Sequence, residues 1–167
     1  LYAKEDMRDA AHGIKYLHDN GVLHRDIKPD NILIFSFEDN IVANSKLTDF
    51  GSSRNINLML TNMTFTSGIG TPVYMAPEVM FRKHYKKPAD IYSFGITLLE
   101  CFKWKEAYGG ENFRYPWGIV DFITKGKRLE KPENVTEKVF ELIKKCWCEE
   151  PKDRISIDEI LDEFENM

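Results

Sequence analysis

The sequence of 167 residues has few cysteines, no long apolar run and no large excess of either charge. Its three cysteines lack the spacing of a disulfide framework or a zinc site, which favours reduced thiols in an intracellular, cytoplasmic protein. No apolar run approaches the roughly 18 residues that a membrane-spanning helix needs. The formal net charge of -4 argues against a nucleic-acid partner. The composition, with 43% hydrophobic and 30% charged residues, is that of an ordinary globular protein.

The N-terminal end also lacks a starting methionine, and LYAKEDMRDAA has neither the basic nor the apolar region of a signal peptide. Helical periodicity begins within a few residues of Leu1. We therefore expect residues 1–167 to form one domain unit that belongs to a longer protein. The main basic cluster can be interpreted as a polyanion-binding face, but we favour a solvated loop before a buried helix. It comprises Arg82, Lys83, His84, Lys86 and Lys87.

Apolar periodicity predicts a mainly α protein that packs around one central helix. Pro88 to Phe102 is apolar on nearly every side, as expected for a helix in the middle of a domain. An amphipathic stripe predicts a first helix that ends near Asn20, with Gly21 as its left-handed cap. Three later helices are predicted over 116–125, ended by Gly126, along the stripe from Val139 to Cys146, and after the capping box of Ser156 and Glu159.

Between the first and central helices the sequence predicts small β-hairpins and a long loop. The β-type runs are Gly21 to His24, Asn31 to Phe37 and Ile41 to Thr48, and a polar turn joins the last two. Residues 49–72 are rich in Ser, Thr, Asn and Gly and have no sustained period. Loops of that length are usually functional, so we expect a mobile functional segment there.

Oxygen donors gather in two short motifs, HRDIKPDN at residues 24–31 and TDFG at residues 48–51. Mg²⁺ prefers hard oxygen ligands and usually takes only one or two from protein, the rest coming from water and nucleotide phosphates. Asn31 and Asp49 fit that role. The two motifs therefore suit a site for a magnesium-bound phosphate.

The same motifs offer groups for phosphoryl transfer to a hydroxyl. Asp26 is the carboxylate available to orient the attacking oxygen and accept its proton. Lys28 can neutralise charge that grows on the transferred group. The residues thus divide into a base, a cation and metal ligands.

These motifs, with GTPVYMAPE at residues 70–78, resemble in order and spacing the catalytic loop, metal-binding loop and activation-segment end of eukaryotic protein kinases. The resemblance covers the whole chain and implies the C-terminal lobe of a kinase, with ATP and Mg²⁺, or Mn²⁺, as cofactors. It implies that Asp26 is the base, Lys28 a phosphate contact, Asn31 and Asp49 the metal ligands, and Leu33 an apolar floor under adenine.

Matches outside the motifs carry the resemblance further. Asp90 resembles the aspartate of the buried central helix that holds the backbone of the catalytic loop. Arg154 resembles the arginine that pairs with the glutamate of APE, here Glu78. His24 and Phe50 would supply the lower half of the hydrophobic spine that aligns active kinases.

Two features point to a branch of the family. Lys28 together with Thr71 resembles serine/threonine kinases, and Thr71 is expected to bridge Asp26 and Lys28, although a plain loop hydroxyl is the alternative. The stretch from Gly126 to Arg154, with CW on the penultimate helix, resembles the tyrosine-kinase-like group, which is mostly serine/threonine-specific. The sequence does not identify the substrate or the parent's regulatory domains.

Regulation and substrate choice rest on fewer residues. Arg25 and Arg54 resemble the cation pair that receives an activation-segment phosphate, so phosphorylation by an upstream kinase or in trans is a hypothesis. The candidate acceptors are Thr64, Thr66 and Ser67, which can equally be plain polar loop residues. Asp30 and Glu100 fall where some kinases that prefer basic substrates place acids, but ordinary surface carboxylates remain the favoured interpretation.

The chain has no G-x-G-x-x-G loop, no strand lysine and no partner glutamate, which a complete nucleotide pocket needs. Two hypotheses follow: an active kinase that acts on protein substrates and needs an N-terminal lobe as its partner, or a pseudokinase or scaffold lobe that binds proteins. The intact set of four chemical residues favours the first. Without that lobe, we expect an exposed apolar face around Leu23, Leu33 and Phe50.

Overall fold

The computed structural model describes residues 2–36, 44–56, 72–81 and 85–167. Six α-helices and four short strands are found in these ranges. The helices are α1 (Tyr2–Asp19), α3 (Pro77–Met80), α4 (Lys87–Lys103), α5 (Pro116–Thr124), α6 (Glu137–Cys146) and α7 (Ile157–Glu165), and the strands are β1 (Val22–Leu23), β2 (Ile32–Ile34), β3 (Ser45–Leu47) and β4 (Arg54–Asn55). The mainly α fold with small two-stranded sheets confirms the prediction.

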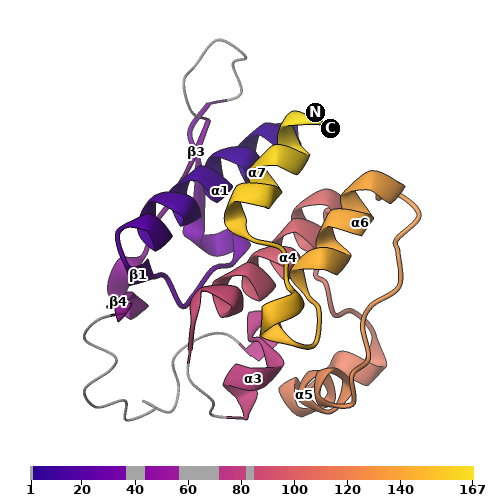
Figure 1. Cartoon of the computed structure of the whole chain (residues 1–167). Helices are drawn as coiled ribbons and strands as arrows, with labels where there is room; N and C mark the ends of the chain where they lie inside the picture. Colours follow the sequence, from indigo (N-terminus) through magenta and orange to yellow (C-terminus); the bar gives the residue numbers. More distant parts are fainter. Residues whose placement is uncertain (1, 37–43, 57–71, 82–84) are drawn as a thin grey trace.

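Helix α4 lies at the centre of the molecule (Figure 1). Helices α1 and α6 and the short turns Pro29–Asn31 and Pro72–Tyr74 pack around it. Every residue from Ala89 to Leu99 is buried. α6 packs closely on α4 at Gly95, where an added Cβ would lie 2.6 Å from the Cβ of Cys146. The predicted central helix is confirmed, and a glycine on it allows a neighbouring helix to pack at close range.

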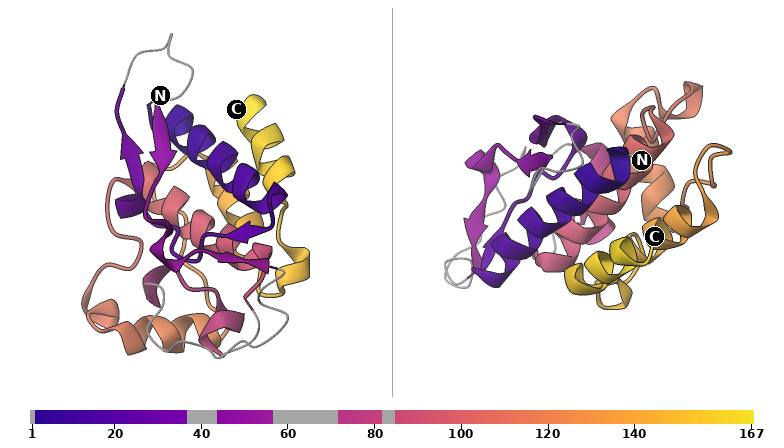
Figure 2. Two further views of the ribbon diagram at one scale, coloured as in Figure 1. Left: turned by 90° about the vertical axis from the view of Figure 1, so that its left-hand side faces the viewer. Right: turned by 90° about the horizontal axis from the view of Figure 1, so that it is seen from above.

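Helix α1 lies beside α7 on one side of α4, as both views of Figure 2 show. Met7, Ala10, Ala11 and Ile14 form its buried stripe and are at most 2% exposed. The helix ends at Asp19, and Gly21 follows with φ of +69°. The predicted first helix and its left-handed cap are therefore confirmed.

The other predicted helix signals also match the structure. Gly126 follows the end of α5 with φ of +73°. The side chain of Ser156 accepts from the backbone N–H of Glu159, and the Glu159 carboxylate accepts from the backbone N–H of Ser156. Within the described ranges, no helix is long and apolar enough to cross a membrane.

The two small sheets agree only in part with the predicted hairpins. β2 pairs antiparallel with β3, in the register Ile32 to Leu47, as predicted. β1 instead pairs with β4, with Val22 opposite Asn55, so the run 21–24 is not part of a local hairpin. The prediction that the whole of 49–72 is a loop was wrong for β4, while residues 57–71 lie outside the described ranges. The predicted basic cluster at 82–87 also falls largely outside them.

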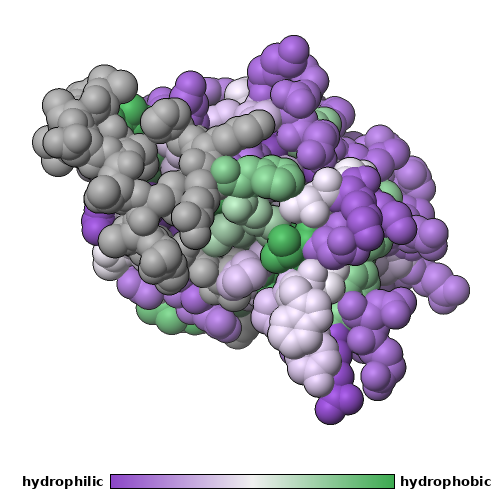
Figure 3. Space-filling model, turned by 90° about the horizontal axis from the view of Figure 1, so that it is seen from below, coloured by the Kyte–Doolittle hydropathy of each residue, from purple (hydrophilic) through white to green (hydrophobic). Residues whose placement is uncertain are grey.

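The end of the molecule formed by α3 and α5 presents aromatic side chains to the surface. Tyr115 and Trp117 stack with ring centroids 4.3 Å apart and are 48% and 68% exposed, and Phe81 is 57% exposed. Figure 3 shows this end, where apolar and near-neutral side chains gather beside the segment drawn in grey.

Candidate active site

The loop that carries HRDIKPDN is anchored to α4 through one buried carboxylate. Oδ2 of Asp90 accepts from the backbone N–H of His24 at 3.0 Å and lies 2.9 Å from Nε2 of His18. Oδ1 accepts from the backbone N–H of Arg25 at 2.9 Å and from the Tyr85 hydroxyl at 2.8 Å. The predicted role of Asp90 as the residue that holds this loop is therefore confirmed by its contacts.

The electrostatics of this anchor favour the ionised carboxylate. Burial raises the pKa of Asp90, but the hydrogen bonds from His18, the Arg25 backbone and Tyr85 outweigh it and hold the pKa below its ordinary value. Burial is the main cause that raises the pKa of Tyr85, and the neighbouring Asp90 carboxylate raises it further. A charged acceptor gives the stronger hydrogen bonds that fix a loop in one geometry.

Arg25 occupies an unusual backbone conformation in this loop. Its φ is +73°, in the left-handed region that non-glycine residues rarely adopt. Its guanidinium carbon lies 5.7 Å from the centroid of the Tyr85 ring, and its Nε is buried with no hydrogen-bond partner in the described residues. Burial and the nearby Arg54 lower the pKa of Arg25. The contacts of the loop thus hold a strained residue immediately before Asp26.

Both ends of the loop are joined to the residue that precedes Asp49. The carbonyl of Thr48 lies 3.0 Å from Nε2 of His24, and the backbone N–H of Thr48 donates to the carbonyl of Asn31 at 2.9 Å. β3 ends one residue before Thr48. These bonds bring the two sequence motifs together although about 20 residues separate them.

Asp26, Lys28 and Asn31 form a compact polar cluster. Nζ of Lys28 lies 3.0 Å from Oδ2 of Asp26, and Nδ2 of Asn31 donates to the same oxygen at 3.1 Å and to the Asp26 carbonyl at 2.7 Å. Among the described residues, both of these side-chain contacts are to Oδ2, which leaves Oδ1 as the acceptor for a further donor. The Asp26 side chain is 13% exposed.

Asp49 extends from the end of β3 into a tight turn. Its φ is +56°, and its Oδ1 accepts from the backbone N–H of Gly51 at 3.2 Å. Phe50 beside it packs on the ring of His24, with centroids 5.4 Å apart, as the spine resemblance implies. Asp49 is exposed, so its carboxylate is available to a ligand.

The donors in this region fit a divalent cation with hard ligands. Nδ2 of Asn31 is engaged by Asp26, which leaves the amide Oδ1 as the atom suited to a metal, and Asp49 adds a carboxylate. Leu33 lies on β2 and is 57% exposed, as an apolar floor for a ligand requires. Thr71, predicted to bridge Asp26 and Lys28, lies outside the described residues.

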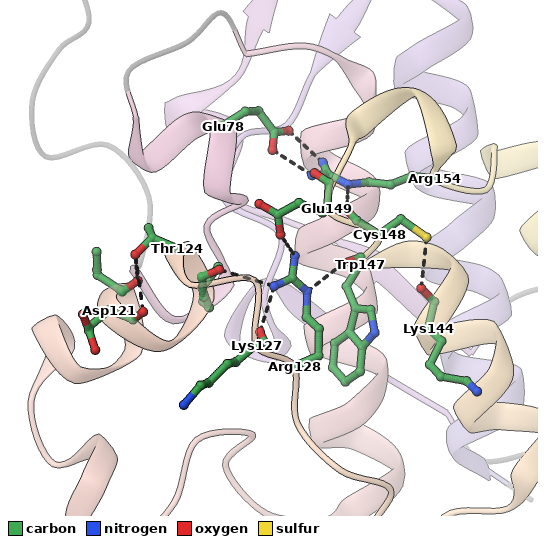
Figure 4. A network of polar contacts seen from close by, with 12 residues as sticks. Glu78, Asp121, Thr124, Lys127, Arg128, Lys144, Trp147, Cys148, Glu149 and Arg154 are labelled. Carbon is green, nitrogen blue, oxygen red and sulfur yellow. Dashed lines mark hydrogen bonds and ion pairs between the residues drawn. The ribbon is translucent and has the colours of Figure 1, made fainter.

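The predicted pair of Glu78 and Arg154 is bidentate and buried (Figure 4). The two guanidinium nitrogens donate to the two carboxylate oxygens, each at 2.7 Å. The remaining donors of Arg154 go to the carbonyls of Cys148, Pro88 and Glu149. This contact fixes α3, which carries APE, against the segment after α6.

Glu100 is engaged in internal contacts. It accepts from the Tyr74 hydroxyl at 2.6 Å and from the backbone N–H of Ala107 at 2.7 Å. Asp30 is exposed. The proposed phosphate acceptors Thr64, Thr66 and Ser67 lie outside the described residues.

The expected apolar face is only partly present. Leu33 and Phe50 are 57% and 51% exposed, but Leu23 is 1% exposed, so its inclusion was wrong. Leu23 is covered because β1 pairs with β4 and packs on α1.

Sequence reasoning missed two residues that support the site, His18 and Tyr85. Both bond to Asp90. His18 follows Ile14 by four positions, so it lies on the buried stripe of α1, and a histidine there is the signal that could have revealed it.

Comparison with known proteins adds independent information. The family model described as "Protein kinase domain" matches residues 2–164. The chain is 42% identical over 160 residues to the serine/threonine-protein kinase STE20 of Saccharomyces cerevisiae, covering 94% of this chain and 16% of that protein.

Two relatives come from Dictyostelium discoideum. A probable LIM domain-containing serine/threonine-protein kinase is 38% identical over 159 residues, covering 95% of this chain and 23% of the relative. The dual specificity protein kinase shkC is 37% identical over 176 residues, covering 100% of this chain and 32% of the relative. The chain therefore spans at most about a third of the length of these three relatives.

Proposed function

This chain belongs to the protein kinase domain family, and on that premise we propose that it is the C-terminal lobe of a serine/threonine kinase that transfers the terminal phosphate of ATP to hydroxyl groups on proteins. The observation that carries the proposal is the Asp26 carboxylate, held by Lys28 and Asn31 and left partly open, beside the turn that presents Asp49. A serine or threonine hydroxyl that attacks a phosphate needs a nearby carboxylate to accept its proton.

In the proposed reaction the substrate hydroxyl approaches Oδ1 of Asp26, which accepts its proton as the oxygen bonds to the terminal phosphorus. The bond from that phosphorus to the bridging oxygen breaks, and the leaving diphosphate keeps the electron pair. The ammonium group of Lys28 neutralises the negative charge that grows on the transferred phosphoryl group. A positioned base of this kind contributes about 10² to 10⁴ in rate.

Asn31 and Asp49 are the residues proposed to hold the metal, Mg²⁺ or Mn²⁺. When bound, the divalent ion neutralises phosphate charge and orients the phosphate chain. Leu33 is proposed to contact adenine, and Lys28 a phosphate. Thr71 completes the proposed set as the link between Asp26 and Lys28.

The substrate class and branch are finer parts of the proposal. Serine/threonine specificity is supported by Lys28 and by the STE20 relatives. The tyrosine-kinase-like branch rests on the sequence resemblance of residues 126–154 alone, whereas the STE20 relative is a differently named kinase. Trp147 is 3% exposed and packs edge-on against Phe140, so it acts there as a core residue. The free thiols of Cys101, Cys146 and Cys148 support an intracellular location.

The proposal for the whole protein includes an N-terminal lobe that closes the nucleotide site. It rests on the absence of a glycine-rich phosphate loop from these 167 residues and on the small share of each relative that the chain covers. Activity is therefore assigned to the parent protein, and the separate chain is expected to turn over negligibly.

The test is transfer of labelled phosphate from Mg-ATP to a generic protein substrate by the parent protein, with Asp26→Asn as the matched variant. We expect the variant to lose about 10² to 10⁴ in kcat, with little change in fold. Circular dichroism and the melting temperature check the fold. Equal activity of the two proteins would refute catalysis by this site and favour a scaffold or pseudokinase role.

Activation by a phosphate near Arg25 and Arg54 is a separate part of the proposal. Arg25 has a buried Nε without a partner in the described residues, and Arg54 already lowers its pKa. A phosphate would relieve the repulsion between the two cations. Mass spectrometry of the active protein should find a phosphate between Ser52 and Thr71, and its consistent absence there would rule this regulation out.

A further inference from the structure

Two short turns that pack on α4 lie close to each other. The turn Pro29–Asn31 belongs to the loop that carries Asp26, and the turn Pro72–Tyr74 precedes α3. Burial is the first cause that raises the pKa of the Tyr74 hydroxyl, and the charge of Asp30 adds to it. The Pro72–Tyr74 turn is therefore a neighbour of the loop that holds the proposed base.

The Pro72–Tyr74 turn also presents a surface. Pro72 is exposed, and Val73 and Tyr74 are partly exposed. A polypeptide that brings a hydroxyl to Asp26 continues on both sides of that hydroxyl and advances about 3.3 Å per extended residue. Within a few residues it must pass over the neighbours of the loop. The Pro72–Tyr74 turn is thus suited to contact a protein substrate, an interpretation that rests on the proposed function.

One face of α4 holds this turn at two points. Oγ of Ser93 donates to the backbone carbonyl of Tyr74 at 2.8 Å. The Tyr74 hydroxyl donates to Oε2 of Glu100 at 2.6 Å. Ser93 and Glu100 are seven positions apart, which is about two turns of helix, so they share a face. The turn is therefore fixed both by its backbone and by its side chain.

The Ser93 hydroxyl has two backbone carbonyls within reach. Its second acceptor is the carbonyl of Ala89 in the preceding turn of α4, at 3.1 Å. A serine inside a helix often bonds back to the carbonyl four positions earlier. A hydroxyl has one proton to donate, and the shorter contact is the one to Tyr74. Ser93 is 5% exposed, so water does not readily replace that bond.

The loop that carries Asp26 is bonded to the same part of α4. Asp90 lies three positions before Ser93 and accepts from two backbone N–H groups of that loop. Every residue from Ala89 to Leu99 is buried, and a close-packed helix deforms little. The distance between the proposed base and the Pro72–Tyr74 turn is therefore set by two neighbouring side chains on one helix.

We propose that Ser93 is a positioning residue for the protein substrate, because it holds the Pro72–Tyr74 turn at a fixed distance from Asp26. Without the Ser93 hydroxyl the turn occupies displaced positions as well. Apparent affinity then falls with the fraction of molecules that keep the competent position. The nucleotide contacts proposed above lie outside this turn, so the effect is confined to the protein substrate.

The test is the Ser93→Ala variant of the parent protein, assayed with Mg-ATP and with myelin basic protein as the phosphate acceptor. We expect KM for the acceptor to rise about fivefold, the change in an equilibrium that a typical neutral hydrogen bond produces. KM for ATP should change less than about twofold, because a ligand that binds both positions of the turn equally does not sense the shift.

The matched control is Thr97→Val. Thr97 is fully buried one turn further along α4, and its Oγ1 donates to the carbonyl of Ser93 at 2.8 Å. This variant also removes a buried hydroxyl, but its bond lies within the helix, so both KM values should change less than about twofold. Melting temperatures report the stability of both variants. An equal rise in KM for the acceptor in both variants, or an equal rise in both KM values of Ser93→Ala, would overturn the proposal.

Hydrogen exchange supplies a readout that does not depend on activity. The backbone N–H of Met75 donates to the carbonyl of Pro72 at 3.3 Å and closes the turn. Mass spectrometry of a peptide that covers residues 72–80 should show faster amide exchange in Ser93→Ala than in Thr97→Val. The same exchange rate in Ser93→Ala and the unaltered parent would refute the anchoring.

The Asp26→Asn variant separates failure of this inference from failure of the proposed function. If Asp26→Asn is as active as the parent, the proposed function is wrong and the role of Ser93 in substrate binding is refuted with it. If Asp26→Asn loses activity while Ser93→Ala behaves like Thr97→Val, the kinase function stands and only the role of Ser93 is refuted.

Discussion

Removing Arg154 should cost much of the stability of the fold. The side chain of Arg154 is fully buried, its five N–H groups all have acceptors, and two of them contact Glu78 at 2.7 Å. Arg154→Ala leaves the Glu78 carboxylate, 10% exposed, without a counter-charge. Breaking one side of a buried pair typically lowers the free energy of unfolding by about 3 to 5 kcal/mol.

The loss is measured by urea unfolding followed by far-ultraviolet circular dichroism. For a domain of this size, about 3 to 5 kcal/mol corresponds to a fall in melting temperature of roughly 6 to 20 °C. Arg154→Lys keeps the charge but not the two-pronged geometry, so it should recover only part of the loss. Glu78→Gln and the double variant complete a cycle that isolates the coupling between the two side chains.

Lys145→Ala is the control for an ion pair at the surface. Lys145 and Glu163 lie 2.6 Å apart but are 51% and 32% exposed, so their pair should contribute less than about 1 kcal/mol. The reasoning is refuted if Arg154→Ala costs no more than Lys145→Ala, or if the double-variant cycle shows additive effects for Arg154 and Glu78.

Three further predictions follow from packing and charge. Gly95→Ala should lower the free energy of unfolding by about 1 to 3 kcal/mol, because its methyl group would lie 2.6 Å from the Cβ of Cys146, whereas Gly109→Ala, with open space around it, should not clash. Asp6→Asn should raise the melting temperature at about pH 7 and lose that advantage as the pH falls below the raised pKa of Asp6, where the wild-type side chain is also neutral. Asp90 has a lowered pKa, so its stabilising effect is present above its ordinary value of 3.8 and is lost on further acidification; Asp90→Asn should flatten this part of an acid-unfolding curve.

The polar cluster of Asp26, Lys28 and Asn31 was predictable from the sequence because its motif is short and local. Asp26, Lys28 and Asn31 lie within six positions on one loop, so their meeting in space needed no knowledge of the fold. Glu78 and Arg154 are 76 positions apart, so their ion pair could be predicted only from the family resemblance. Helix ends were also predictable, because glycine is favoured where the chain turns left-handed after a helix. Gly21 and Gly126 both follow helices and both have positive φ.

What the sequence could not provide depends on contacts between distant segments. β1 and β4 have two residues each, too short to produce an alternating pattern, and their pairing buries Leu23. A histidine on an apolar helical stripe gives no clue to its partner, so the bond from His18 to Asp90 could not be derived.

The bonds to Asp90 have a consequence for the order in which a growing polypeptide becomes functional. His24 and Arg25 precede Asp90 by 66 and 65 positions, so a ribosome exposes the loop well before the carboxylate that fixes it. At about 5 to 20 residues per second, the delay is roughly 3 to 13 seconds. During that interval the nascent loop already carries Asp26, Lys28 and Asn31 but has no carboxylate to accept from its backbone, so the loop can reach its final geometry only after the central helix has been synthesised.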